Sequence, residues 1–189
     1  MATPFRTKQI KCTSPYGTRT NPVTGKLNSY HYGQDLIPVS NVSGITIESD
    51  WLVYSCEPGT VVDVNKTTAR GKYVDVLLND GKIIIRYQHL DSTNVTKGTK
   101  VTKSTVIGVA GSTGQVTGRH LHIEVFENGT RQYSVPTPWS LVPNVIGVHT
   151  VSQYGEHVNV MTVNSTGEIK DYGSYADIEQ TTDYIKFKK

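Results

Sequence analysis

Short runs of alternating apolar and polar residues, each ending at a turn signal, are the feature that most constrains how this 189-residue chain folds. Alternate side chains of a β-strand point to opposite faces of the sheet, so such runs are typical of strands with one buried face. Residues 73–78 and 83–90 are two runs of this kind, and Asn79-Asp80-Gly81 between them readily forms a tight turn. The pattern predicts a β-hairpin here.

The same pattern predicts further strands along the chain. Residues 60–65 and 106–110 form two of them, and residues 120–126 and 131–135 form a second hairpin. Residues 41–50 are less regular and are interpreted as a surface insertion. Val, Thr, Ile and Tyr are plentiful, helix-favouring runs are scarce, and 17 Gly punctuate the chain. We therefore expect mostly β structure.

The length allows one domain with a sizeable core and a short appendage. The pattern of alternating strands stops at a proline-rich stretch, which is typical of the end of a domain; it contains Pro136, Pro138, Trp139 and Pro143. We predict one domain at residues 1–144 and a C-terminal extension of unknown role at residues 145–189. A small hairpin is predicted in this extension, from residues 157–164 and 168–172.

Composition excludes several classes of protein. The net charge of +3 is mild, and no cluster of Lys and Arg interleaved with aromatic residues indicates a nucleic-acid partner. No stretch approaches the roughly 20 apolar residues that span a membrane. The N-terminus is basic but has no apolar segment, so no secretory signal is visible. We expect either that a signal has been removed or that the protein leaves its cell by lysis or in a phage particle.

The chain has only two cysteines, Cys12 and Cys56, which cannot make a disulfide framework. One bridge between them is one interpretation, and two inert buried thiols are favoured over it. Neither cysteine has a Cys or His at zinc-finger spacing, so a structural cysteine-zinc site is excluded.

His120 and His122 form the first pair of chemical interest. At positions i and i+2 of a strand they share one face, while Leu121 and Ile123 can enter the core. Two imidazoles on one face are poor core material, so a metal-binding or catalytic role is favoured over packing. A solvated strand face is the alternative for the pair taken alone.

His31 and Asp35 supply an imidazole and a carboxylate, both of which suit zinc. With a third protein ligand they would leave a fourth position for water, which is the arrangement of catalytic zinc sites. Gly33 between them and Pro38 after them indicate an irregular turn rather than a helix. Without His122, an ordinary exposed turn would be preferred.

His89 lies near the end of the strand at residues 83–90, on the face predicted for Ile85 and Tyr87. The chain has no H-E-x-x-H helix, the motif of zinc proteases that use its glutamate as the general base. Another group must therefore act as the base. Histidine can take the proton of an attacking water and can steady an oxyanion near neutral pH. A strand-terminal histidine that bonds a carbonyl is the alternative interpretation.

Taken together, these residues resemble the lysostaphin/LytM-type zinc endopeptidases of bacterial peptidoglycan, over residues 12–141. The motifs follow the family's order: the turn S-P-Y-G-T-R-T-N-P from Ser14, H-Y-G-Q-D-L from His31, P-G-T-V-V from Pro58, Y-Q-H-L from Tyr87, G-S-T-G from Gly111 and G-R-H-L-H-I-E from Gly118. Three positions depart from the family's usual residues: Ser104, Arg119 and Ile123. All five positions that carry the chemistry are intact, so a degenerate relative is not expected.

The resemblance implies a compact antiparallel β-sheet or barrel-like peptidase domain with a groove, and a role for each residue. His31, Asp35 and His122 would hold one Zn²⁺ per chain, and His89 and His120 would be catalytic, with either as the general base. Glu124 could orient a ligand, although a solvated carboxylate is favoured. Three candidates for substrate binding are Arg19, Tyr32 and Tyr87, with an ion pair or aromatic packing as the alternatives. Residues 41–50 and 112–117 would line the groove.

The function that the resemblance implies is zinc-dependent hydrolysis of peptide bonds in bacterial peptidoglycan, in the stem peptide or a cross-bridge. The expected location is extracellular, at the cell wall. The missing signal adds a phage-encoded lytic or tail-associated enzyme, with a virion partner, to the hypotheses. A non-catalytic wall-binding or structural tail module on the same scaffold is the alternative.

Overall fold

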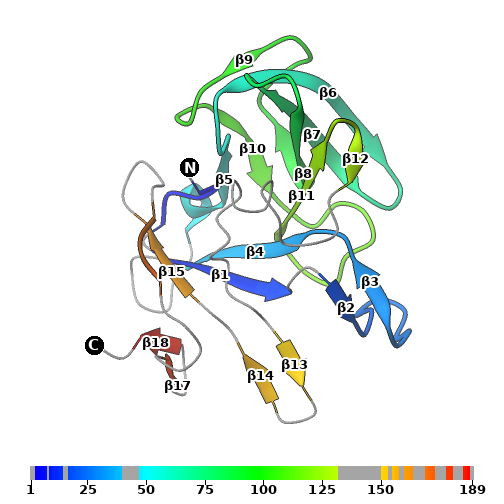
Figure 1. Cartoon of the computed structure of the whole chain (residues 1–189), viewed down its shortest axis with the longest axis vertical. Helices are drawn as coiled ribbons and strands as arrows, with labels where there is room; N and C mark the ends of the chain where they lie inside the picture. Colours follow the sequence, from blue (N-terminus) through cyan, green and yellow to red (C-terminus); the bar gives the residue numbers. More distant parts are fainter. Residues whose placement is uncertain are drawn as a thin grey trace.

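The chain is described by a computed structural model that covers residues 3–7, 9–14, 17–39 and 47–131, and six short strands beyond them at 150–152, 155–157, 160–163, 169–172, 178–180 and 185–187. Strands dominate these residues (Figure 1), and one short 3-10 helix, η1, occupies Glu48–Trp51. The strands are β1 (Gln9–Ser14), β2 (Gly17–Arg19), β3 (Ser29–His31), β4 (Gln34–Val39), β5 (Leu52–Tyr54), β6 (Gly59–Thr67), β7 (Gly71–Leu78), β8 (Ile83–Thr93), β9 (Lys100–Val101), β10 (Val106–Ala110), β11 (Leu121–Glu127), β12 (Thr130–Arg131), β13 (Thr150–Ser152), β14 (Gly155–His157), β15 (Val160–Val163), β16 (Ile169–Tyr172), β17 (Ile178–Gln180) and β18 (Ile185–Phe187).

One large antiparallel sheet organises the molecule. Its strands follow the order β16-β15-β1-β4-β11-β8-β7-β6-β9, while β10 pairs with β8 and β5, and β12 pairs with β11. The predicted antiparallel β fold is therefore confirmed. Closure into a barrel is not, because β16 and β9 at the two ends of this path do not pair with each other in the described part of the chain.

The predicted strands are present. β7 and β8 form the first predicted hairpin, and Gly81 in its turn has φ +71°, a conformation that costs glycine little. β6 and β10 match the other two predicted strands, and β11 pairs with β12 as the second hairpin. Residues 132–135 of that hairpin and residues 40–46 of the predicted insertion lie outside the described residues.

The core lies against one face of the central strands β4, β11, β8 and β7. Leu36, Tyr87, Leu121 and Ile123 are among its fully buried side chains. Burying a side chain of this size stabilises the fold by about 1.5–3 kcal/mol relative to exposure. The apolar face of each strand thus fixes the register of strand pairing. The register in turn determines which side chains lie on the opposite face of the sheet.

Cys56 belongs to the same core as a free, fully buried thiol, and burial raises its pKa to about 12. It therefore stays protonated and unreactive at neutral pH. For Cys56 this agrees with the inert buried thiol that the sequence favoured over a disulfide. The side chain of Cys12 lies outside the described residues.

In the C-terminal region, β15 and β16 form the hairpin predicted there, and β15 pairs with β1 through Ile10 and Met161. The division into a domain at residues 1–144 and an extension at residues 145–189 stays a prediction. Within the described residues, no helix is both long enough and apolar enough to cross a membrane.

Candidate active site

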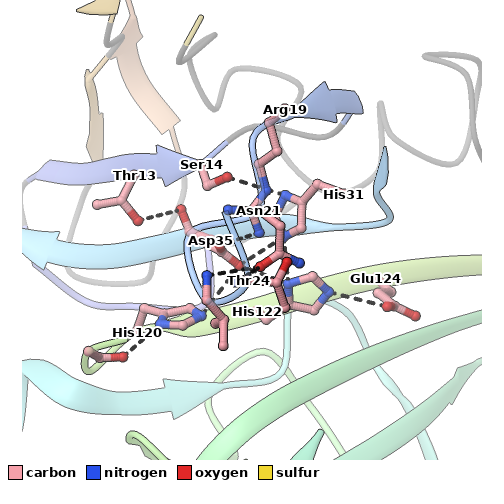
Figure 2. Close-up of polar contacts among 12 residues, drawn as sticks. Thr13, Ser14, Arg19, Asn21, Thr24, His31, Asp35, His120, His122 and Glu124 are labelled. Atoms are coloured by element: carbon pink, nitrogen blue, oxygen red, sulfur yellow. Dashed lines mark hydrogen bonds and ion pairs between the residues drawn. The ribbon is translucent and has the colours of Figure 1, made fainter. Parts of the chain in front are cut away.

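His31, Asp35 and His122 come together where β4 runs beside β11. Asp35 and His122 are direct partners in the register of these strands, and His31 ends β3 just before them. Nδ1 of His122 lies 2.8 Å from Oδ1 of Asp35 and 3.0 Å from Nε2 of His31. Nε2 of His31 lies 3.2 Å from Oδ1 of Asp35. Figure 2 shows the two imidazoles and Arg19 arranged around Asp35. All three predicted ligands are buried.

The chemistry and spacing of these three atoms fit a zinc ion. Two imidazole nitrogens and one carboxylate oxygen are ordinary zinc ligands, and ligands about 2.0–2.1 Å from a tetrahedral ion lie about 3.3 Å from one another. The three sides of the triangle, 2.8, 3.0 and 3.2 Å, are close to that spacing. With three protein ligands, a fourth position is left for water or substrate.

Gly33 explains why the motif needs a glycine between His31 and Asp35. A Cβ at this position would collide with the carbonyl oxygen of Ile123 and would lie 2.5 Å from Nε2 of His122. The chain bends at Gly33, so the predicted irregular turn is present. The bend lets β4 pass close enough to β11 for the ligands to meet.

Hydrogen bonds orient the two ligating imidazoles. Nδ1 of His31 lies 3.4 Å from the hydroxyl of Ser14, which leaves Nε2 facing Asp35. Nε2 of His122 donates to Glu124 at 3.2 Å, which leaves Nδ1 facing the same carboxylate. A partner on the second ring nitrogen fixes the tautomer and orientation of a metal-binding histidine.

Glu124 is only 5% exposed, so the solvated carboxylate favoured by the sequence is wrong. Its carboxylate affects the charge of His122. Burial alone would lower the pKa of His122, but the hydrogen bonds to Asp35 and Glu124 outweigh it and raise the pKa to about 9. Burial would likewise raise the pKa of Asp35, yet three imidazoles hold it well below its usual range. The carboxylates of Asp35 and Glu124 therefore favour positive charge at His122, whereas burial lowers the pKa of His31.

His89 faces the groove, and the face predicted for it is wrong. Ile85 and Tyr87 are fully buried in the core, whereas the ring centroid of His89 lies 5.6 Å from that of His122. The register of β7 against β8 shifts beside this position, and His89 has φ 64°. Such a bulge ends the strict alternation of faces and re-aims the side chain. A non-glycine residue with this φ is strained, which is common at functional sites.

His120 completes the cluster from the other side, with its ring centroid 4.9 Å from that of His89. Nδ1 of His89 donates to the carbonyl of Thr113 at 2.9 Å, and Nδ1 of His120 donates to the carbonyl of Gly118 at 2.8 Å. Nε2 of neutral His89 therefore carries no proton, whereas Nε2 of His120 lies 3.4 Å from Oδ1 of Asp35. Burial and then the neighbouring His122 and His120 lower the pKa of His89 to about 4, so this ring is neutral at pH 7 and can accept a proton.

These residues line a groove of about 820 Å³. Gln115, Val116 and Thr117 contribute to one wall, as predicted for part of residues 112–117. Residues 18–23 contribute to the other wall, and Arg19 among them lies 3.6 Å from Asp35. No residue of 47–50, the described part of the predicted insertion, lines the groove.

The two tyrosines predicted to bind substrate lie elsewhere. Tyr87 is fully buried, and its hydroxyl accepts a hydrogen bond of 2.9 Å from the backbone N–H of Cys56, so a role in substrate binding is wrong. Tyr32 is 40% exposed beside Tyr30 and is not among the groove residues, and its role stays a prediction. Gln88 also lines the groove and was not predicted, although strand alternation around Tyr87 places it on the groove face.

The family model described as Peptidase family M23 matches residues 40–134, half of the chain. The chain belongs to peptidase family M23. This membership confirms the resemblance to the lysostaphin/LytM-type peptidases. Three of the five residues predicted to bind the metal or to be catalytic, His89, His120 and His122, lie inside the matched segment of this M23 chain. His31 and Asp35 precede it and are joined to it by the fold.

Curated relatives agree with M23 membership. Peptidoglycan DD-endopeptidase ShyA of Vibrio cholerae is 35% identical over 112 residues, which cover 59% of this chain and 23% of that protein. Lysostaphin of Staphylococcus simulans is 31% identical over 131 residues, which cover 64% of this chain and 24% of that protein. The M23 chain thus spans about a quarter of the length of these relatives.

Solved structures agree with the fold. The catalytic domain of lysostaphin from Staphylococcus simulans superposes with a TM-score of 0.55 at 26% identity, over 72% of this chain and 92% of that domain. A zinc containing peptidase from Vibrio cholerae also gives 0.55, at 29% identity, over 72% of this chain and 40% of that chain.

Proposed function

We propose that this chain is a zinc-dependent endopeptidase that hydrolyses peptide bonds in bacterial peptidoglycan. The observation that carries the proposal is the convergence of His31, Asp35 and His122 in one groove, with His89 and His120 beside them. Three metal ligands alone could form a zinc site that only stabilises the fold. A ligand triangle open to a groove, next to two histidines that do not belong to it, suits hydrolysis.

The residues divide into those that hold the metal and those that move protons. Nε2 of His31, Oδ1 of Asp35 and Nδ1 of His122 would hold one zinc ion, which supplies Lewis acidity that polarises a carbonyl and lowers the pKa of water when it is bound. Asp35 also lies 3.6 Å from Arg19, which limits repulsion between this carboxylate and an anionic group in the groove.

His89 and His120 would perform the proton transfers. One neutral imidazole accepts the proton of the attacking water through Nε2 and later donates it to the leaving amine. The other, when protonated, stabilises the negative oxygen that forms on the substrate carbonyl. The carbonyls of Thr113 and Gly118 keep both rings in the orientation that these roles need.

The names of the relatives support a peptidoglycan substrate. ShyA, ShyB and ShyC of Vibrio cholerae are named peptidoglycan DD-endopeptidases, whereas ALE-1 of Staphylococcus capitis is named a glycyl-glycine endopeptidase. We propose that this chain acts outside the cell, at the wall, on a stem peptide or a cross-bridge.

A phage origin with a virion partner is a narrower form of the proposal. It is supported by a prophage-encoded M23 protein, EnpA of Enterococcus faecalis, whose catalytic domain superposes with a TM-score of 0.53 at 25% identity, over 69% of this chain and 92% of that chain. We further propose that residues 1–144 form the peptidase domain and that residues 145–189 are an extension. Detection of the polypeptide in intact virions would test the origin.

The test of the proposed activity combines zinc content with hydrolysis of purified peptidoglycan. We expect about one zinc per chain, release of new amines, loss of that release on chelation and its return on addition of zinc. Mass spectrometry of the fragments identifies the cleaved bond. A protein that retains zinc and binds wall but releases no amines would contradict the proposal and support a non-catalytic wall-binding module.

A further inference from the structure

Two polar side chains in the groove, Gln88 and Arg70, have no part in the metal and proton chemistry described above. Both line the groove beside His89, and the backbone carbonyl of Arg70 accepts a hydrogen bond of 3.1 Å from the N–H of His89. They therefore lie next to the place where the scissile bond must be held.

Gln88 is a buried polar side chain without a partner. It pairs directly with His122 in the register of β8 and β11 and is 3% exposed. Its Nε2 atom has no hydrogen bond in the described part of the chain. A buried amide without a partner costs stability, so natural proteins rarely keep one unless a ligand or water completes it. The amide can present either its NH₂ group or its oxygen by rotation about its last bond.

Arg70 lies in the turn between β6 and β7, which is held in place by neighbouring segments. Besides the bond from His89, the carbonyl of Ala69 accepts a hydrogen bond of 3.0 Å from the N–H of Gln115. The guanidinium of Arg70 lies 5.7 Å from the ring centroid of Tyr73, and that of Arg86 lies 5.0 Å from the same ring. Arg86 is the register partner of Glu124, so Arg70 stacks on the sheet face that carries the groove.

The other arginines near the groove already have carboxylate partners. Arg19 lies 3.6 Å from Asp35, and Arg119 makes two hydrogen bonds to Glu48 at 2.7 and 2.8 Å. Across the described residues, Arg70 takes part in no ion pair. Among the groove arginines Arg19, Arg70 and Arg119, Arg70 is thus the one without a carboxylate partner in the described residues.

The nearby Glu124 would not repel an anion strongly. Its carboxylate bonds His122 at 3.2 Å and faces Arg86 across the strands, so its charge is compensated on both sides. A guanidinium and an amide NH₂ together match the two oxygens of a carboxylate.

We propose that Arg70 and Gln88 form a subsite that binds a carboxylate of the substrate peptide close to the cleaved bond. The inference rests on the proposed function and names its substrate class. The preferred substrate is a peptide that carries a free carboxylate beside the scissile bond, rather than an uncharged glycine bridge or a peptide in which that carboxylate is amidated.

The test measures binding separately from hydrolysis. Two synthetic stem peptides that differ only in one carboxylate or carboxamide are titrated calorimetrically into zinc-loaded His89→Ala protein, which we expect to keep the metal and to cut at least about 100-fold more slowly. We expect the carboxylate peptide to bind about 10- to 100-fold more tightly, since a charge-assisted pair is among the stronger hydrogen bonds. Adding Arg70→Gln should remove most of that preference, and adding Gln88→Met should reduce it. Adding Lys66→Gln, which removes a positive charge from the exposed end of β6, should leave it unchanged.

Hydrolysis of the same two peptides by the wild-type protein tests the proposed function itself. Failure to cut either peptide contradicts the endopeptidase, while the calorimetric ratio still decides the subsite. Equal or absent binding of the two peptides, or a preference that survives Arg70→Gln, overturns the subsite even if both peptides are cut. Zinc content and circular dichroism of each variant distinguish loss of the subsite from loss of the fold.

Discussion

β8 and β11 carry two faces of opposite character within the same two strands. One face is fully buried and apolar apart from one hydroxyl, and the other lies on the side of the groove and is charged or polar. The first consists of Ile85, Tyr87, Ile123 and Val125, and the second of Arg86, Gln88, His122 and Glu124. The comparison teaches that the apolar face sets the register and the register then aligns the chemical groups of the polar face.

The charged side chains of the polar face are compensated in pairs, whereas the amide of Gln88 is not. Glu124 accepts from His122, and Arg86 makes two hydrogen bonds to Asp75 at 2.7 and 2.6 Å. Burial would lower the pKa of Arg86, but the hydrogen bonds to Asp75 outweigh it and raise the pKa. A buried ion pair of this kind adds little to the stability of the fold, but removing one partner lowers that stability strongly.

The largest expected effect comes from removing histidines of the polar face. His122→Ala should abolish both zinc retention and activity, because it removes one of three ligands. His89→Ala should lower kcat about 10²- to 10⁴-fold and spare most of the zinc, because a proton-transfer group is worth that factor. Metal analysis together with amine release from peptidoglycan measures the two effects separately. Normal turnover by either variant refutes the assignment of that residue.

Strand alternation predicted much of this comparison from the sequence. His120 and His122 line the groove while Leu121 and Ile123 enter the core, as two-residue periodicity requires. The hairpin of β7 and β8 followed from its turn residues. The likeness of the motifs to the family then indicated which distant segments meet, which periodicity cannot do.

The same periodicity failed where the backbone departs from a regular strand or where burial depends on three-dimensional packing. The bulge beside His89 and its positive φ reverse its face, and neither can be read from local residue types. Glu124 shares a strand face with His122, two residues before it, but its burial could not be read from the sequence because Arg86 becomes its neighbour only through strand pairing. Tyr87 is an amphipathic residue whose buried hydroxyl bonds a segment 31 residues away.

The second expected effect tests whether the buried charges of the polar face depend on each other. Asp75→Asn should lower the free energy of unfolding by about 2–3 kcal/mol, because it takes the counter-ion away from the partly buried guanidinium of Arg86. Asp80→Asn in the exposed turn between β7 and β8 is the matched control and should change it by less than about 0.5 kcal/mol. Urea denaturation of both variants measures the difference. Equal midpoints would show that the ion pair contributes nothing that water cannot replace.

The third effect concerns the link between the polar face and the metal. Glu124→Gln should weaken zinc binding about 10- to 100-fold, since it removes the charge that orients and polarises His122. Competition with a chelator of known affinity measures the loss. Glu127→Gln, at the end of the same strand, is the control and should bind zinc like the wild type. Unchanged zinc affinity in Glu124→Gln would mean that packing alone positions His122.

The smallest expected effect distinguishes the one hydroxyl of the apolar face from a substrate contact. Tyr87→Phe keeps the ring in the core but leaves the buried N–H of Cys56 without an acceptor, so it should cost about 1–3 kcal/mol of folding free energy. Burial raises the pKa of Tyr87 well above its ordinary value, so the hydroxyl stays protonated and its oxygen can still accept this bond. Tyr32→Phe, on the exposed surface, should change stability by less than about 0.5 kcal/mol.

The kinetic result for the same two variants completes the comparison. Because Tyr87 contributes to the core and not to the groove, Tyr87→Phe should leave KM for a soluble peptide unchanged at temperatures where the variant is folded. A raised KM in a fully folded Tyr87→Phe protein would contradict the separation of the two faces, because a side chain of the apolar face would then affect the substrate directly. A raised KM in Tyr32→Phe would instead place substrate on the surface beside Tyr30, beyond the groove that the metal ligands share.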